Sequence, residues 1–143
     1  MSGAGWAVTD GGGEGTEVGN MPKVVHFEIP VDDPQRATAF YRDVLGWEVS
    51  RFGEEPYWLV RAGEQQEPGA DGALVQREEL HRSPVVIAGV ADIDAVLAQV
   101  QKSGGQVVMG KQPIPGMGWS AYAHDSEGNT IGFFQPDSQA AAE

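Results

Sequence analysis

The chain has 143 residues and a formal net charge of −12, from 21 acidic and 9 basic residues. That length suits one domain with its own hydrophobic core. The absence of cysteine excludes disulfides, thiolate metal sites and a cysteine nucleophile. An acidic surface repels a phosphate backbone, so we expect no nucleic-acid partner. The sequence shows neither a membrane-spanning apolar run nor a signal peptide, so we expect a cytoplasmic protein with no membrane partner.

Both ends of the chain differ in composition from its middle. Residues 1–20 are rich in glycine and have little apolar surface to bury, so we expect a disordered tail there. Residues 137–143 are predicted to be a second, frayed end. The folded domain is therefore expected at residues 21–136, as two similar halves at about 22–80 and 83–136.

The first half begins with an alternating segment that predicts a half-buried strand at residues 24–29. Its apolar side chains, Val25, Phe27 and Ile29, fall on one face of the strand. The other face carries His26 and Glu28.

A helix is predicted next, because Asp33 can cap it and Pro34 suits its first position. Gly46 can end this helix in the left-handed conformation. Its predicted core-facing side is formed by Ala37, Phe40, Tyr41, Val44 and Leu45. Strands are expected afterwards at residues 47–51, 57–61 and 73–77.

The second half repeats this order with a strand at residues 85–90 and a helix capped by Asp92. The apolar face of this helix is predicted to be Ile93, Val96, Leu97 and Val100, with Gly104 at its end. Strands are expected at residues 106–109, 119–124 and 130–135. The segment Asp125–Asn129 is typical of a hairpin turn, which Asp125 would cap with its own side chain.

An internal repeat of this kind predicts an α+β fold. Each half is a βαβββ module, and two modules in tandem form a curled mixed sheet with a concave surface between them. A concave sheet surface is a common place for a ligand cavity.

The sequence resembles the vicinal oxygen chelate superfamily, which includes glyoxalase I, bleomycin-resistance proteins and extradiol dioxygenases. The resemblance covers about residues 23–135. Within the superfamily, the chain is most similar to the branch of small glyoxalase-related proteins of unsettled activity. In the first module it rests on the runs His26–Pro34, Ala39–Tyr41 and Leu45–Trp47. In the second module it rests on Val90–Asp94, Gly104–Val107, Ile114–Trp119 and Asp125–Asn129.

The resemblance implies where a metal would be bound in such a fold. Metal-dependent members take one ligand from each of the first, fourth, fifth and eighth strands. These positions correspond here to His26, the segment 73–75, Val85 and Gly132. Only His26 has a side chain that can bind a metal, so we expect no metal site and no cofactor, and a weakly held divalent ion stays as an alternative.

The pair His26 and Glu28 is the main catalytic candidate, because both side chains should point into the cavity. They could act as a general acid and base or as two ligands of a non-standard metal site. The alternative is structural, with His26 bonded to a neighbouring strand and Glu28 in solvent at the cavity rim.

Aromatic side chains suggest a binding wall for a flat or apolar molecule. The predicted ligand-binding residues are Trp58, Trp119, Tyr122, His124 and Phe134. The alternative is that these side chains simply fill the space of the lost metal. The loop at residues 113–118 is predicted to be a lid, whereas His81 is expected to be solvated surface.

These expectations favour a metal-free module that binds a small organic molecule. The alternative is an enzyme (a lyase, isomerase or dioxygenase-like protein) that acts on a small carbonyl or aromatic compound through His26 and Glu28. A third possibility is an interaction protein whose cavity is filled by its own side chains. The resemblance also implies a homodimer.

Overall fold

The computed structural model describes residues 22–141, which fold as the predicted α+β arrangement of two modules. The predicted tail at residues 1–20 lies outside the described residues. The first module contains β1 (Val24–Val31), α1 (Pro34–Leu45), β2 (Glu48–Arg51), β3 (Tyr57–Arg61) and β4 (Asp71–Gln76). The second contains β5 (Val85–Gly89), α2 (Ile93–Lys102), β6 (Gln106–Ile114), β7 (Gly118–His124) and β8 (Thr130–Pro136).

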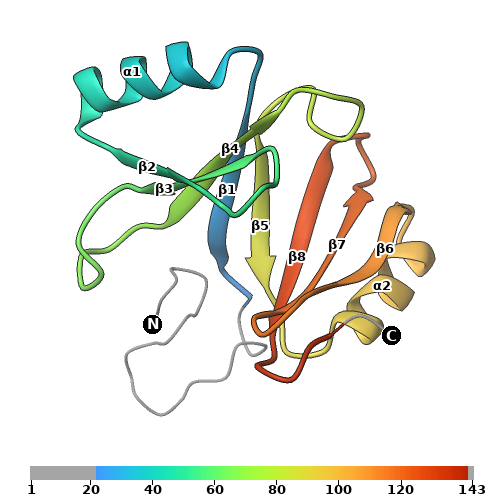
Figure 1. The fold of residues 1–143 in the computed structure, drawn as a ribbon. Helices are drawn as coiled ribbons and strands as arrows, with labels where there is room; N and C mark the ends of the chain where they lie inside the picture. Colours follow the sequence, from blue (N-terminus) through green and yellow to red (C-terminus); the bar gives the residue numbers. More distant parts are fainter. Residues whose placement is uncertain (1–21, 142–143) are drawn as a thin grey trace.

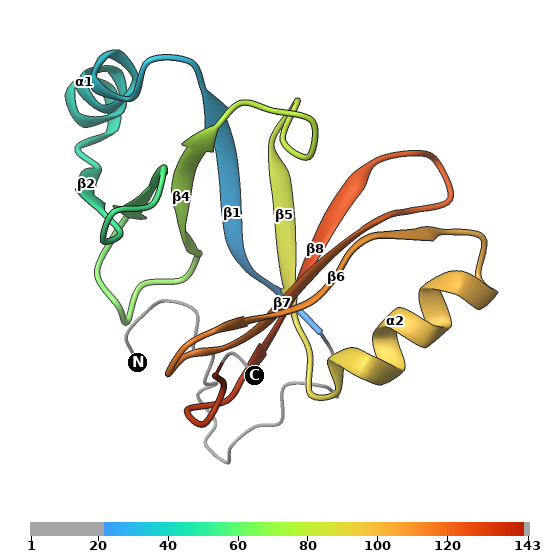
Figure 2. The same ribbon diagram turned by 45° about the vertical axis from the view of Figure 1, so that its right-hand side comes forward.

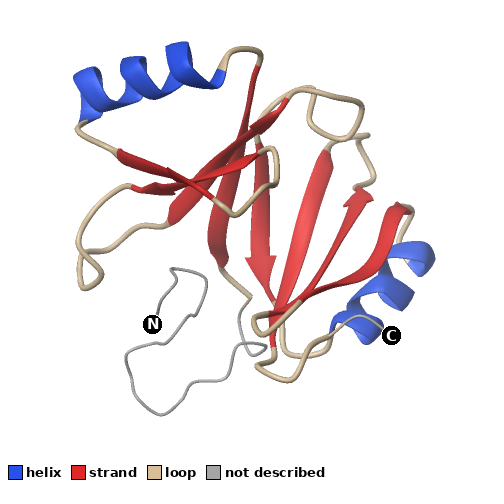
Figure 3. Cartoon of the chain, viewed as in Figure 1, coloured by secondary structure: helices blue, strands red, loops and turns tan. Residues whose placement is uncertain are grey.

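All eight strands form one mixed sheet in the order β2-β3-β4-β1-β5-β8-β7-β6. The first strand of each module is parallel to the last strand of the same module. Antiparallel pairing of β1 with β5 joins the modules at the centre of the sheet. Figures 1 and 2 show that the sheet curls on either side of this central pair. The two helices lie far apart, near opposite ends of the sheet (Figure 3).

The predicted helix ends are confirmed by their hydrogen bonds. The carboxylate of Asp33 accepts from the backbone N–H groups of Gln35 and Arg36. Asp92 accepts from the N–H of Ala95 at the start of α2. Gly46 follows α1 with a φ of 75°, a conformation that favours glycine because a Cβ is strained there.

The predicted core face of α1 is wrong for three of its five residues. Phe40, Val44 and Leu45 are 57%, 60% and 54% exposed. The helix lies beside the short strand β2 at the margin of the sheet, so only its near side reaches the core (Figure 1). That side carries Ala37 and Tyr41, which pack on the cluster around Val31, Val60 and Leu74.

The core face predicted for α2 is confirmed. Ile93 is fully buried, and Val96, Leu97 and Val100 pack on the cluster that contains it. This cluster also takes up Ala121 and Ala123 from β7. The second helix is thus held more firmly than the first.

The lid predicted at residues 113–118 is wrong. Strand β6 runs to Ile114 and β7 begins at Gly118, which leaves only a tight turn between them. The N–H of Met117 donates to the carbonyl of Ile114, and that of Gly116 donates to the carbonyl of Ala140. These bonds fix the turn in place, and Ile114, Pro115 and Met117 line the cavity described below.

The turn Asp125–Asn129 agrees with prediction. The carboxylate of Asp125 accepts from the N–H groups of Glu127 and Asn129, and these bonds lower its pKa. Gly128 supplies a φ of 86°. The turn therefore closes the β7–β8 hairpin as its sequence indicated.

The chain beyond β8 returns to the body of the domain. Ala140 is buried, and Asp137 accepts a hydrogen bond from the indole of Trp119 at 3.0 Å. Within residues 22–141, neither helix has the length and apolar character needed to cross a membrane.

Candidate functional site

A cavity of about 950 Å³ opens on the concave side of the sheet, between residues of both modules. Strands β1 to β5 contribute to its wall, together with the turn after β4 and the β6–β7 hairpin. Its apolar wall includes Leu59, Val75, Leu80, Ile87, Ile114 and Met117. The structure therefore provides a space of the size that small organic ligands occupy.

His26 and Glu28 both line this cavity, as their alternation along β1 predicted. Each is 1% exposed, because β1 is a central strand with β4 on one side and β5 on the other. Glu28 is therefore buried, and the expectation that it could face solvent at the rim is wrong.

Three donors surround the carboxylate of Glu28. The hydroxyl of Tyr57 donates to Oε2 at 2.7 Å, and the hydroxyl of Tyr122 donates to Oε1 at 2.7 Å. The imidazole Nε2 of His81 also donates to Oε1, at 2.6 Å. The donors come from β3, β7 and the linker between the modules, so this one carboxylate connects both halves of the domain.

The protonation state of Glu28 follows from these bonds. Burial by itself raises the pKa of a carboxyl group, because the charged form loses its hydration. The hydrogen bonds that Glu28 accepts from His81, Tyr57 and Tyr122 oppose that effect, and the pKa of Glu28 lies below its usual range. Glu28 is thus an anion that accepts hydrogen bonds.

His26 extends the network on one side. Its Nε2 lies 2.8 Å from the hydroxyl of Tyr57. Since that hydroxyl gives its proton to Glu28, it accepts a hydrogen bond from the Nε2–H of His26. Burial lowers the pKa of His26 to about 4, although the nearby charge of Glu28 raises it in part. His26 is therefore neutral at pH 7.

The two tyrosines remain neutral donors. Burial raises the pKa of both hydroxyl groups far above 10, and the charge of Glu28 raises it further. A negative charge on either ring would face the carboxylate at hydrogen-bond distance. The network therefore holds a single carboxylate charge among neutral tyrosine hydroxyls.

His81 is the main correction to the predicted site. It is 6% exposed instead of solvated, because the chain after β4 turns back over the cavity. The backbone N–H of His81 donates to the carbonyl of Glu78 in this turn. The neighbouring Leu80 packs against the core cluster of Val85 and Ile87. Burial of Leu80 thus carries His81 inward to Glu28.

Among the five residues predicted to bind a ligand, only Tyr122 lines the cavity. Trp58 lies on the other face of β3, where it packs near Val31 and Leu74. Trp119 packs on the cluster of Ala121 and Ala123. The predicted cavity positions of Trp58 and Trp119 are therefore wrong, because each side chain points to the opposite side of its strand.

The remaining two predicted ligand-binding residues also lie away from the cavity wall. Phe134 is 2% exposed and packs in the core beside Val85, Ile87 and Tyr122. His124 is at the far end of β7, paired with Gln106 and Thr130. Neither is among the described residues that line the cavity.

Sequence reasoning missed Tyr57, which provides the polar wall of β3. Tyr57 pairs with Val75 and Leu59 pairs with Ala73, and this register turns Tyr57 and Leu59 into the cavity. Ser120 and Phe52 were missed as well. The available signal was the alternation of Tyr57 and Leu59 with Trp58, but the sequence alone does not say which set faces inward.

The metal site implied by the resemblance does not fit these residues. Val85 and residues 73–75 offer no ligand, and a Cβ at Gly132 would lie 2.8 Å from Ile87 and 3.1 Å from the ring of Tyr122. The Tyr122 ring therefore occupies the space that a ligand at position 132 would need. Within residues 22–141, no group of three or more His, Asp or Glu side chains is arranged to hold a metal ion.

Substitution of Gly132 by alanine is expected to lower the free energy of unfolding by about 2 kcal/mol, because the new methyl group overpacks the contact of Ile87 with Tyr122. Urea unfolding measures this change. Gly110→Ala is the matched control, since a Cβ at Gly110 meets nothing within 4 Å. Equal changes in the two variants would show that Tyr122 does not fill the place of a side chain at 132.

The eight-stranded curled sheet with its cavity defines a class of two-module βαβββ proteins, and comparisons with known proteins agree. Residues 23–63 match the family described as bleomycin resistance protein-like N-terminal. A glyoxylase-like domain-containing protein of Didymella fabae is 30% identical over 116 residues, which cover 72% of this chain and 85% of that protein. Lactoylglutathione lyase of Haemophilus influenzae is 33% identical over 124 residues, covering 79% and 92% of the two chains.

Solved structures show the same fold. A variant of the methylmalonyl-CoA epimerase of Streptomyces coelicolor, in complex with 2-nitronate-propionyl-CoA, matches with a TM-score of 0.59. Its sequence identity is 16%, and the match covers 84% of this chain and 98% of that one. The chain belongs to the glyoxalase/bleomycin resistance/dioxygenase superfamily, as the sequence resemblance predicted.

Proposed function

We propose that this chain is a binding module that takes up a small, mostly apolar organic molecule in the cavity between its modules. The observation that carries the proposal is the cavity itself, about 950 Å³ in volume, with aliphatic walls and a few polar groups. Phe52, Tyr57, Tyr122 and Phe133 add aromatic surface to it. Such a combination favours binding of an apolar body that a few polar contacts orient.

An enzyme acting on a small carbonyl or aromatic compound is the second candidate. The bonded set of His26, Tyr57 and Glu28 favours it, because proton transfer needs titratable groups in contact. The pKa values of His26 and Glu28 argue against an enzyme. A general base works best when its pKa lies near the working pH, yet the pKa of His26 is about 4 and that of Glu28 lies below its usual range. Both are weak bases at pH 7.

The test is native mass spectrometry of the purified full chain, before and after addition of a mixture of small aromatic and aliphatic compounds. We expect stoichiometric binding of at least one apolar compound. Ser120→Phe should abolish this binding, because Ser120 lines the cavity and a ring there occupies it. Ser138→Phe is the matched control, since Ser138 is exposed and outside the cavity wall. Binding that survives Ser120→Phe would overturn the proposal.

A turnover assay distinguishes the second candidate. If a compound that binds is also converted, His26→Gln should abolish conversion and leave binding in place. Conversion of a bound compound that depends on His26 would show that the chain is an enzyme, and the proposal of a binding module would be given up.

The predicted homodimer belongs to this proposal, whereas the predicted domain end at residue 136 is too early, because Asp137 and Ala140 pack against the domain. Support for a dimer comes from the apolar group formed by Phe40, Val44 and Leu45, which is exposed on α1. Light scattering coupled to gel filtration measures the mass in solution, and a monomer at all concentrations would remove the dimer from the proposal.

A further inference from the structure

Charged side chains around the cavity are mostly acidic. Among the described residues that line it, Arg61 is the one arginine or lysine side chain. The acidic residues in the wall are Glu28, Glu48, Glu55, Asp71 and Glu78. The cavity thus has a negative surround in a protein of net charge −12, which favours a cationic or neutral ligand over an anionic one.

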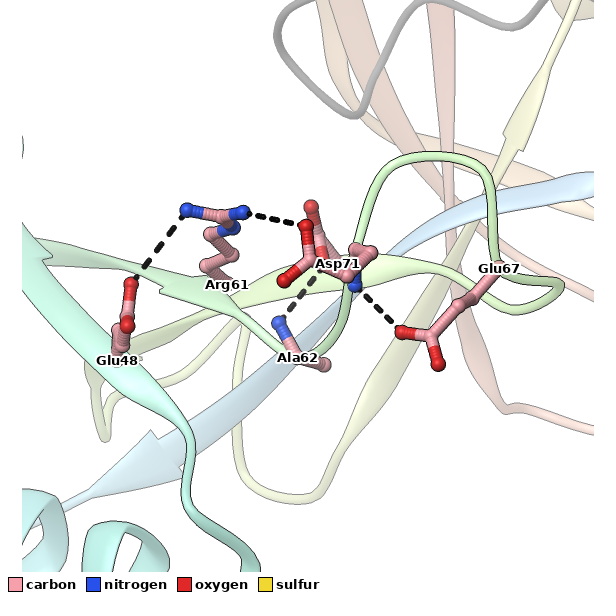
Figure 4. Close-up of polar contacts among 6 residues, drawn as sticks. Glu48, Arg61, Ala62, Glu67 and Asp71 are labelled. Atoms are coloured by element: carbon pink, nitrogen blue, oxygen red, sulfur yellow. Dashed lines mark hydrogen bonds and ion pairs between the residues drawn. The ribbon is translucent and has the colours of Figure 1, made fainter.

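The acidic groups at one end of the cavity already have partners. Arg61 reaches Glu48 at 3.7 Å and Glu64 at 3.1 Å, which neutralises the one cation of the wall. The carboxylate of Asp71 accepts from the N–H of Ala62 at 2.8 Å (Figure 4). This end of the cavity therefore has no positive charge left over for an anionic ligand, and its carboxylates already have hydrogen-bond or ion-pair partners.

Glu55 and Glu78 lie at the other end of the cavity. Tyr57 pairs with Val75 in antiparallel register, so the residues before Tyr57 and after Val75 meet at the same edge. Both carboxylates are exposed, and neither forms an ion pair within the part of the chain that the structure describes.

The arginines that are close in sequence to these carboxylates are engaged elsewhere. Arg51 lies over the ring of Trp58, and its guanidinium donates to the backbone carbonyl groups of Glu54 and Glu55. Arg77 pairs with Asp32 at 3.0 Å. Arg82 pairs with Glu79 at 3.2 Å. None of these three arginines lines the cavity.

His81 provides a second observation at the same end. It follows Glu78 in the turn after β4, and it lines the cavity. Its Nε2 donates to Glu28, whereas its buried Nδ1 has no hydrogen-bond partner among residues 22–141. In the neutral imidazole this nitrogen accepts a hydrogen bond. An N–H donor on a ligand would supply the bond that Nδ1 lacks.

From this arrangement we infer that the ligand is a small apolar molecule with one protonated amine, whose ammonium group is held at the end of the cavity formed by Glu55, Glu78 and His81. This inference rests on the proposed function, because it names the chemical class that the same cavity selects. The apolar body lies against the aliphatic wall. The N–H groups of the ammonium face the carboxylates of Glu55 and Glu78 and the acceptor nitrogen of His81.

The same charges argue against an acyl-CoA ligand for this chain. The epimerase structure named above holds a propionyl-CoA derivative. A CoA thioester carries several phosphate charges, which are bound best by arginine, lysine or helix N-termini. In the described wall, Arg61 is the one candidate, and two carboxylates already engage it.

Three probes with one carbon skeleton test the inference: 4-phenylbutylamine, 4-phenylbutan-1-ol and 4-phenylbutyrate. Calorimetry with the full chain at pH 7 measures their affinities. We expect the amine to bind about tenfold more tightly than the alcohol, since two exposed ion pairs give gains of this order. The carboxylate should bind more weakly than the alcohol. The preference should shrink in 1 M salt, where charges are screened beyond about 3 Å.

The double variant Glu55→Gln with Glu78→Gln should bind the amine and the alcohol equally and keep the affinity for the alcohol. Glu54→Gln with Glu79→Gln is the matched control, because it changes the net charge equally outside the cavity wall. It should keep the tenfold preference.

The outcomes separate the two proposals. Alcohol binding without a preference for the amine, or a preference that survives the change at Glu55 and Glu78, overturns the amine inference and leaves the binding module standing. Tighter binding of the carboxylate does the same. If none of the three probes binds, both the amine inference and the proposed function fail.

Discussion

Replacement of Glu28 by glutamine is expected to lower the free energy of unfolding by about 3 kcal/mol, the range found when one partner of a buried charged network is removed. The carboxylate accepts three hydrogen bonds at 2.6 to 2.7 Å and is 1% exposed. An amide has one acceptor oxygen and a donor nitrogen. It therefore leaves at least one of Tyr57, Tyr122 and His81 facing another donor where water does not reach.

Urea unfolding at pH 7 measures this change, and the exposed variant Glu48→Gln is its matched control. Glu48 has a side chain that is 75% exposed and lies 3.7 Å from Arg61, so its loss should change stability by no more than about 0.5 kcal/mol. A loss below about 1 kcal/mol for Glu28→Gln would mean that the tyrosine hydroxyls and His81 find other partners.

The strength of the network can be apportioned by a double-mutant cycle. Tyr122→Phe removes one donor to Glu28 and should cost about 1 to 2 kcal/mol. When Glu28 is already glutamine, Tyr122→Phe should lower the free energy of unfolding by less, because the Tyr122 hydroxyl no longer bonds to a carboxylate in that background. Additive costs would contradict a direct contact between the two side chains.

Much of the fold could be predicted because its signals are local. Alternation along β1 placed His26 and Glu28 on one face, and the pair of Asp33 with Pro34 marked the start of α1. Asp125 capped its turn for the same reason. In each case the atoms that interact are only a few residues apart, so a short stretch of sequence contains both partners.

The predictions that were wrong concern features that depend on which neighbouring element a segment packs against. Strand β3 is apolar through Tyr57, Trp58, Leu59 and Val60, so its alternation does not tell which face is inward. Pairing with β4 decides it, and this pairing turns Tyr57 toward Glu28 and Trp58 away. A register of this kind is a property of the assembled sheet.

The burial of His81 and the exposure of α1 have the same origin. His81 stands among charged residues in the sequence, but the apolar Leu80 beside it packs against the second module and carries the turn inward. The apolar spacing of α1 is that of a buried helix, yet the helix lies at the end of the sheet, where it packs through Ala37 and Tyr41 and leaves Phe40, Val44 and Leu45 exposed. The local sequence indicated whether each side chain is polar or apolar. Its neighbours, and therefore its burial, depend on where the segment lies in the assembled sheet.

Stability is expected to fall by about 2 kcal/mol as the pH is lowered from 6.5 to 4.5, because of His26 alone, at 1.36 kcal/mol for each unit of pH. The unfolded chain protonates this imidazole near its ordinary pKa of 6.5, whereas burial lowers the pKa in the folded chain to about 4. Between these values the unfolded state binds more protons than the folded state. A fall in pH through this window therefore favours unfolding.

Glu28 acts in a separate window. Its folded pKa lies below the ordinary value of 4.5, so its stabilising effect is complete above that pH and is lost only as the pH falls further. The interval from 6.5 to 4.5 thus separates the effect of His26 from that of Glu28. The measurement is urea unfolding at half-unit steps of pH, with His26→Gln and the matched control His124→Gln, a half-buried histidine outside the network. His26→Gln should flatten the curve in this interval, and His124→Gln should leave its slope unchanged. A slope that persists without His26 would show that its ring is hydrated in the folded chain and takes up a proton near pH 6.5, which would give the cavity a base suited to proton transfer at neutral pH.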